Sequence, residues 1–196
     1  MTRPLPRDFY ERSSIALARD LLGKVVVSEL GGTRTAGRIV EVEAYRPDDP
    51  ASHSFRGPTP GNQTMFGPPG HAYVYVSYGI HRCMNAVARS GSAVLLRALE
   101  PLHGLDAMAA RRGLDQERLL CAGPGRLCQA LGVTRGEDGV DLTAGEGLWI
   151  TEGPPPRRVG RTPRIGISVG GDRPWRFVEE GSPYASRRAT ASPAGG

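Results

Sequence analysis

The sequence contains a single lysine, Lys24, although 25 of its 196 residues are lysine or arginine. Nearly all of its positive charge is therefore carried by arginine, whose planar array of donors suits phosphate groups and purine edges. The formal net charge of +5 is modest, but the excess of arginine makes nucleic acid the first partner to consider. A genome rich in G and C would also favour arginine codons, and that explanation stays open.

Long apolar segments are missing as well. No stretch approaches the ~20 apolar residues that a membrane span requires. The first residues, MTRPLPRDFYERSS, contain no apolar signal segment. We therefore expect a cytoplasmic, bacterial-type protein without membrane contacts, which would associate with the nucleoid if its partner is DNA. No heptad pattern is present, so we expect a monomer.

Several catalytic motifs are also missing from the sequence. It contains no GxxxxGK[ST] loop, no HExxH, no GxSxG and no Rossmann glycine fingerprint. The three cysteines, Cys83, Cys121 and Cys128, include no close pair of the zinc-binding or redox type. We expect them to be reduced core residues. Because the four histidines are scattered along the chain, we expect no metal site and no cofactor.

Glycine and proline are abundant, with 27 and 17 residues, which is typical of short strands joined by tight turns. A helix is predicted over residues 8–24, with Asp8 or Ser13 as its cap and Gly23 at its end. Alternating patterns predict strands over residues 24–30, 35–45, 71–79, 84–89, 93–100, 147–153, 164–169 and 175–180, and helical patterns cover residues 103–113 and 125–132.

Strands dominate this pattern, and the helices come in blocks instead of alternating with the strands. That order predicts an α+β fold, with a largely antiparallel, curved β-sheet and flanking helices. We expect one compact domain over residues 1–186. The tail, residues 187–196, contains little that could be buried and is expected to be disordered.

One predicted strand carries an unusual series of side chains at its end. In GRIVEVEAYRPDDPASHSF, residues 37–55, Glu41, Glu43 and Tyr45 alternate with apolar residues and so share one strand face. This face is either a solvated edge or the floor of a site. In a dry site, one carboxylate could act as a general base toward water. The following loop adds Asp48, Asp49 and His53, a titratable cluster that a plain surface strand would not require.

The segment GHAYVYVSYGIHRCMN places Tyr73 and Tyr75 on one strand face. Aromatic residues favour strands in general, so these side chains could simply form a stiff core strand. They could equally form a platform on which a planar base stacks. Tyr78 precedes Gly79, which suits a sharp turn that leaves the tyrosine ring projecting from the fold, where it could act as a wedge between base pairs.

The segment CAGPGRLCQALGV begins a predicted helix with Gly123, Pro124 and Gly125. Proline in the first turn and free backbone N–H groups could bind a phosphate, with Arg126 beside them. Helix capping alone explains the same pattern.

Six fragments occur in an order and at separations that resemble one known family. They are VEVEAY, HSF, GNQTMF, YVYVSYGIHRCMN, AVLLRALEPLHGL and LCAGPGRLCQALGV. Together they resemble the alkyladenine (3-methyladenine) DNA glycosylases from about Leu21 to Ser186. The resemblance implies an enzyme that rotates an alkylated or deaminated purine nucleotide out of duplex DNA and hydrolyses its N-glycosidic bond in base excision repair.

The resemblance also implies roles for individual residues. Glu43 matches the carboxylate that activates the attacking water. Tyr45, His53 and Tyr75 match the base pocket, where rings pack on both faces of the extruded purine. The other matching residues are Arg97 and Asn85, which help to hold the water and shape the purine edge, and Tyr78 and Met65, which match the residues inserted into the duplex.

The basic segment near the C-terminus, PPPRRVGRTPRIGISVGGDRPWRF, is shorter and richer in arginine than in the animal members. Within it, Arg161 and Arg164 are candidates for phosphate contacts, together with Gly123, Gly125 and Arg126.

The shortage of lysine bears on the mechanism. Glycosylases that also cut the strand need an amine for a Schiff base with the sugar, and Lys24 is far in sequence from the acidic cluster. We therefore expect a monofunctional enzyme acting on damaged double-stranded DNA, with the α-amino group of the chain as a formal exception. Two alternatives remain: a non-catalytic nucleic-acid-binding module with an aromatic stacking platform, and an enzyme acting on free nucleosides.

Overall fold

Two long strands, β2 (Thr35–Tyr45) and β5 (Ala93–His103), form the centre of the computed structural model, which describes residues 3–187. They are neighbours in an antiparallel sheet with the order β3-β4-β5-β2-β1-β6, and β8 joins β2 to β7. The remaining strands are β1 (Val25–Ser28), β3 (Ala72–Ser77), β4 (His81–Val87), β6 (Leu148–Thr151), β7 (Val159–Thr162) and β8 (Arg176–Glu179).

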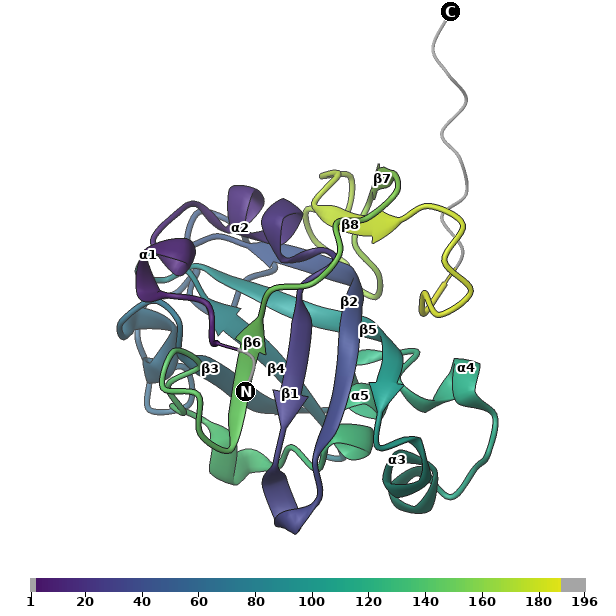
Figure 1. Cartoon of the computed structure of the whole chain (residues 1–196). Helices are drawn as coiled ribbons and strands as arrows, with labels where there is room; N and C mark the ends of the chain where they lie inside the picture. Colours follow the sequence, from purple (N-terminus) through teal and green to yellow (C-terminus); the bar gives the residue numbers. More distant parts are fainter. Residues whose placement is uncertain (1–2, 188–196) are drawn as a thin grey trace, which may run out of the picture.

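Strand β2 uses one edge for two different partners. Its first residues pair with β1, whereas residues 41–43 pair with β8, and β5 occupies the other edge along most of its length. The register against β5 shifts on both sides of Glu41. Such bulges bend a strand and increase its twist, and the sheet is accordingly curled (Figure 1). Because β2 lies inside this sheet, its acidic residues are not at a free edge.

Helices pack around the curled sheet (Figure 1). They are α1 (Arg7–Tyr10), α2 (Ser14–Leu21), α3 (Leu105–Arg112), α4 (Glu117–Leu120) and α5 (Pro124–Leu131), with 3₁₀ turns η1 (Leu30–Gly32), η2 (Gln63–Phe66) and η3 (Arg135–Glu137). Helix α5 packs on β4 and β5 and buries Leu127, Cys128 and Leu131 in the main core. This contact fixes the start of α5 beside the ends of the central strands.

The single compact α+β fold confirms the sequence-based prediction, and β2 has the predicted bounds. The helix predicted over residues 8–24 is instead two helices, because the chain breaks before Ser13, whose hydroxyl caps α2 by accepting from the backbone N–H of Ala16. The strand predicted over residues 164–169 is wrong, since this segment is an irregular loop. Strand β7 and helix α4 were not predicted.

The three cysteines are buried and unpaired, as predicted. Within residues 3–187, none of the helices combines the length and apolar character needed to cross a bilayer. The predicted disordered tail lies outside the described residues except for Arg187.

Candidate active site

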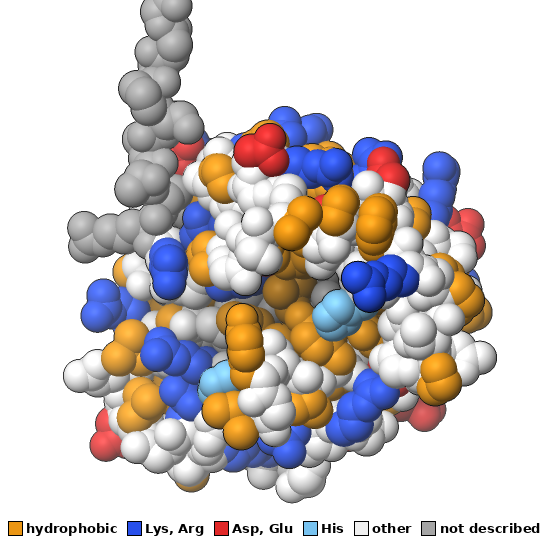
Figure 2. All heavy atoms as spheres, turned by 180° about the vertical axis from the view of Figure 1, so that it is seen from behind, with side chains coloured by type: hydrophobic (Ala, Val, Ile, Leu, Met, Phe, Trp, Pro, Cys, Tyr) orange, Lys and Arg blue, Asp and Glu red, His pale blue; other side chains and the backbone are white. Residues whose placement is uncertain are grey.

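A cavity of about 330 Å³ opens between the ends of the central strands, the start of α5 and the loop at residues 163–174. This volume is at the lower end of the ~300–1,000 Å³ that is usual for small-molecule sites. The face of the molecule shown in Figure 2 is hollowed, with apolar side chains in the hollow and lysine or arginine side chains around it. The cavity is lined by Tyr45, Ala51, Ser52, His53, Met65, Tyr73, Tyr75, Ser77, Tyr78, Cys83, Asn85, Leu95, Arg97, Pro124, Ile165, Gly166 and Ile167.

Glu43 lies directly behind this lining and is fully buried. Its Oε2 atom accepts a hydrogen bond from the Tyr45 hydroxyl at 2.9 Å and lies 3.3 Å from Nη1 of Arg97. Its Oε1 atom accepts from the backbone N–H of Ile165 at 2.7 Å. All three partners line the cavity. A carboxylate has about four acceptor positions, so one remains for a further donor such as water.

This burial contradicts the interpretation of the Glu41–Tyr45 face as a solvated edge. Burial, and secondarily the charge of Glu43, raise the pKa of Tyr45 far above its ordinary value. The Tyr45 hydroxyl therefore stays protonated and donates to Glu43.

Glu41 lies beneath the same site and is also fully buried. Its Oε1 atom accepts from Nε of Arg97 at 3.0 Å and from Nε of Arg176 at 2.8 Å. Burial disfavours the charge on Arg97, but the fields of Glu43 and Glu41 outweigh it and raise the pKa of Arg97. Arg97 is thus a permanently charged bridge between the two carboxylates.

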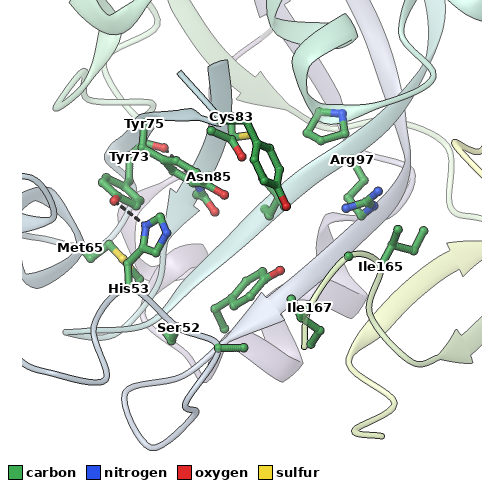
Figure 3. Close-up of a pocket in the computed structure, with 17 residues that line it drawn as sticks. Ser52, His53, Met65, Tyr73, Tyr75, Cys83, Asn85, Arg97, Ile165 and Ile167 are labelled. Carbon is green, nitrogen blue, oxygen red and sulfur yellow. Dashed lines mark hydrogen bonds between the residues drawn. The ribbon is translucent and has the colours of Figure 1, made fainter. Parts of the chain in front are cut away.

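Aromatic rings form the opposite side of the cavity (Figure 3). Tyr73 and Tyr75 are stacked, with ring centroids 5.5 Å apart and an interplanar angle of 29°. The His53 ring meets Tyr75 edge-on at 4.4 Å, and its Nδ1 lies 2.9 Å from the Tyr73 hydroxyl. Burial lowers the pKa of His53 and raises the pKa of Tyr73 to about 12. Both groups are therefore neutral at pH 7.

Tyr78 projects from the turn between β3 and β4, as the sequence predicted. Its side chain is 88% exposed, and its backbone has a φ of +51°, in the left-handed region. Val76 and Ile80, on either side of it, are also exposed. The turn therefore presents an apolar tip to solvent at the edge of the cavity.

Two predicted DNA contacts require correction. Met65 is only 2% exposed and packs against Tyr73 in a small core cluster, so it forms part of the cavity wall and does not project toward a duplex. Arg164 is also buried. Its Nη1 donates to the backbone oxygen of Ala44 and to the carboxylate of Asp49, and its guanidinium lies over the Tyr45 ring. A phosphate cannot reach it.

Asn85 is buried in the cavity wall and donates through Nδ2 to the backbone oxygen of Tyr73 at 3.0 Å. At the start of α5, Gly123 is the N-cap residue and Pro124 is the first helical residue, which lines the cavity. A Cβ atom at Gly125 would lie 3.2 Å from the His81 side chain, so this side chain would have to shift slightly to accept it.

Arg126 is exposed and lines a second, larger hollow, while Pro124, two residues earlier at the start of α5, lines the cavity. This hollow, which we call the arginine groove, has a volume of about 930 Å³. It is lined by the arginines Arg118, Arg126, Arg158, Arg161 and Arg187. Arg158 pairs with Glu180, whereas Arg118, Arg126 and Arg161 have no carboxylate within 4 Å in the described part of the chain.

Several site residues were not predicted from the sequence. Ile165 and Ile167 belong to the segment that was interpreted as a strand, and Asp49 was noted only as part of a titratable loop. Ile165 contributes its backbone N–H to Glu43. No side-chain pattern can indicate such a contact.

A cavity with aromatic rings on one side and a buried carboxylate behind it has the features that enzymes acting on extruded nucleobases require. The family model for methylpurine-DNA glycosylase (MPG) matches residues 8–183, and the chain therefore belongs to this family. Membership identifies a DNA-3-methyladenine glycosylase type of enzyme, a hydrolase that acts on N-glycosyl bonds of DNA.

Similar proteins agree with this assignment. A protein of Nitrosospira multiformis is 52% identical over 191 residues, which cover 95% of this chain and 96% of the relative. One of Agrobacterium fabrum is 51% identical over 94% of this chain and 93% of its own length. One of Rubrobacter xylanophilus is 55% identical over 81% of this chain and 85% of its own length. Each bears the name "Putative 3-methyladenine DNA glycosylase".

Proposed function

We propose that this protein binds duplex DNA, rotates an alkylated or deaminated purine nucleotide into the cavity, and hydrolyses the N-glycosidic bond with a water molecule activated by Glu43. The free base leaves, and the resulting abasic site enters base excision repair. The observation that carries this proposal is the position of Glu43, which is fully buried while its three hydrogen-bonding or ionic partners line the cavity.

The chemical step needs a proton acceptor beside the water. In this step the water oxygen bonds to C1′ of the deoxyribose, one water proton moves to Glu43, and the electrons of the glycosidic bond move to the purine. A purine methylated at N3 or N7 is positively charged and leaves readily. Arg97 and the N–H of Ile165 orient the carboxylate through contacts of 3.3 Å and 2.7 Å.

The aromatic residues supply base recognition. We infer that the extruded purine lies between Tyr45 on one side and the Tyr75 and His53 rings on the other, where each stacked base gains ~1–3 kcal/mol. A cationic methylated purine gains further from an electron-rich phenol face. Asn85 is placed to contact the purine edge. Tyr78, projecting at the rim, would fill the space that the extruded nucleotide leaves in the duplex.

The arginine groove offers a path for the DNA backbone away from the lesion. Its guanidinium groups without carboxylate partners, on Arg118, Arg126 and Arg161, suit phosphate oxygens. We infer that they bind the flanking strand.

Among residues 3–187, no amine that could form a Schiff base lines the cavity. Lys24 is paired with Glu152 at 2.6 Å and is not among the lining residues. We therefore propose a monofunctional, water-using reaction.

The test is the Glu43→Gln substitution. Its amide oxygen can still accept from Ile165, but the side chain cannot take a proton. We expect single-turnover release of base from duplexes carrying 3-methyladenine, 7-methylguanine or hypoxanthine to fall by about 10²–10⁴-fold. Affinity for the same duplexes should change by less than a few fold. Glu146→Gln, on an exposed turn, is the matched control and should retain full activity.

Full activity in Glu43→Gln would refute the proposed role of this carboxylate. If the unaltered protein binds lesion duplexes but releases no base, the non-catalytic binding module is correct instead. An enzyme for free nucleosides would cleave nucleosides at an unchanged rate after Tyr78→Ala and at high salt.

A further inference from the structure

The last described residues of the chain reach the charged groups beneath the cavity. Residues 181–187 follow β8 and end at Glu41, a part of the molecule more than 140 residues earlier in the sequence. The backbone N–H of Ser186 donates to Oε2 of Glu41 at 2.6 Å, and its hydroxyl donates to Oε1 at 2.8 Å. The C-terminal segment thus supplies half of the four hydrogen bonds that Glu41 accepts.

The other two donors to Glu41 differ in how firmly they are held. Arg176 also donates through Nη1 to Thr162 at 2.9 Å and through Nη2 to the backbone oxygen of Arg187 at 2.7 Å. Among the described residues, Arg97 has only carboxylate partners, Glu41 at 3.0 Å and Glu43 at 3.3 Å. If Glu41 lost one of its hydrogen-bond donors, Arg97 would therefore move more readily than Arg176.

We propose that Ser186 is a positioning residue for base release. Because Ser186 donates two hydrogen bonds to Glu41, Arg97 can lie between the two carboxylates and stay in contact with Glu43. This inference rests on the proposed role of Glu43. A buried carboxylate that loses a donor draws its remaining partners closer. Without the Ser186 hydroxyl, Arg97 shifts toward Glu41, and Glu43 loses the cation that orients it toward the water.

The role of the Ser186 hydroxyl can be tested separately from the rest of residues 181–187. Ser182 lies in the same segment, but within residues 3–187 its hydroxyl bonds only to the backbone N–H of Tyr184, from which it accepts at 3.3 Å. Ser182→Ala is therefore a matched control that removes a hydroxyl without touching Glu41. Ser186→Thr is the conservative variant that keeps the donor.

The experiment compares Ser186→Ala, Ser186→Thr and Ser182→Ala in the full chain. For Ser186→Ala we expect the single-turnover rate of base release at saturating enzyme to fall about tenfold, which corresponds to the loss of one hydrogen bond to a charged group. The affinity for the lesion duplex should change less than twofold. Ser186→Thr should recover most of the rate, and Ser182→Ala should match the unaltered protein.

A second measurement is independent of catalysis. In ¹⁵N NMR spectra of the arginine Nε–H groups, Ser186→Ala should shift the Arg97 signal and increase its hydrogen exchange, whereas Ser182→Ala should leave it unchanged. An unchanged rate together with an unchanged Arg97 signal would overturn the proposal, and so would a loss of rate that Ser182→Ala reproduces. If the unaltered protein released no base, the proposed function would fail, and the Arg97 signal alone would still decide whether Ser186 positions this side chain.

Discussion

Replacing Asp49 by asparagine should destabilise the protein and slow base release at the same time. Asp49 and Arg164 form an ion pair in which both side chains are 0% exposed. Apart from Asp49, Arg164 donates only to the backbone oxygen of Ala44, and its Nε and Nη2 atoms have no hydrogen-bond partner among the described residues. Without the charge of Asp49, the guanidinium would be buried and uncompensated.

The expected size of this effect follows from the burial of the pair. Removing one partner of a buried pair costs about 3–5 kcal/mol. Because asparagine still offers an acceptor oxygen, we expect the lower end, about 3 kcal/mol. For a chain of this length, each 1 kcal/mol lowers the melting temperature by about 2–4 °C, so the expected decrease is about 6–12 °C. Arg164→Met should cost less, because Asp49 keeps Arg173 at 3.7 Å and the N–H of Ala51 at 3.2 Å.

The functional effect arises because Arg164 anchors the loop that contacts Glu43. The next residue, Ile165, donates its backbone N–H to this carboxylate. We therefore expect Asp49→Asn to lower the single-turnover rate of base release, measured well below its own melting temperature.

The matched control is Asp48→Asn, one residue earlier. Asp48 is 60% exposed and pairs with Arg46, which is also largely exposed. Urea and thermal unfolding should not distinguish this variant from the unaltered protein, because exposed pairs contribute little. If Asp49→Asn lowered stability no more than Asp48→Asn does, the buried pair would not be the anchor that we describe.

Two further predictions concern the rim and the aromatic side of the cavity. Tyr78→Gly should leave the free energy of unfolding unchanged or raise it by up to ~1 kcal/mol, because a non-glycine residue at φ +51° is strained and Tyr78 is 88% exposed. Base release at subsaturating enzyme should nevertheless fall. A loss of stability in calorimetry would contradict the prediction of backbone strain. Burial lowers the pKa of His53 below its ordinary ~6.5, so below that pH the unfolded chain binds a proton that the folded one does not, and stability should fall as the pH falls. Urea unfolding at pH 7.5 and 5.5 should show a smaller difference for His53→Gln, but not for the exposed His103→Gln.

The sequence predicted the parts of the fold that depend on local alternation. Strand β2 was predicted over residues 35–45, and in its second half Val40, Val42 and Ala44 alternate with Glu41, Glu43 and Tyr45. Residues 164–169 alternate in the same way but form a loop, since Arg164 is fixed by Asp49 and Ile165 turns its N–H to Glu43. These long-range contacts override the local preference for a strand, and the sequence of the segment does not indicate them.

In the site, too, local alternation could be predicted from the sequence and long-range contacts could not. Alternation placed Tyr73 and Tyr75 on one face, and their stacking agrees with it. Burial of the Glu41 face could not be predicted, because the sequence does not reveal that the loop at Ile165 and the segment ending at Ser186 lie against it. Arg164 was misplaced for a related reason. An arginine in a basic segment resembles a phosphate ligand, and only the fold brings Asp49 beside it.

The charges beneath the cavity can be explained by the reaction more readily than by stability. Replacing a buried ion pair by apolar residues of similar size is often neutral or stabilising, so the fold does not require charge there. A base that takes a proton from water must instead carry negative charge in a dry wall, and that charge is tolerable only with compensating cations. Near the cavity, three buried carboxylates, Glu41, Glu43 and Asp49, face three buried guanidinium groups, Arg97, Arg164 and Arg176. A fourth buried carboxylate, Glu179, pairs with Arg38 instead. The other members contact Glu43, one another or the loop that donates to Glu43. In the proposed mechanism, the whole set would therefore orient one carboxylate next to the cavity.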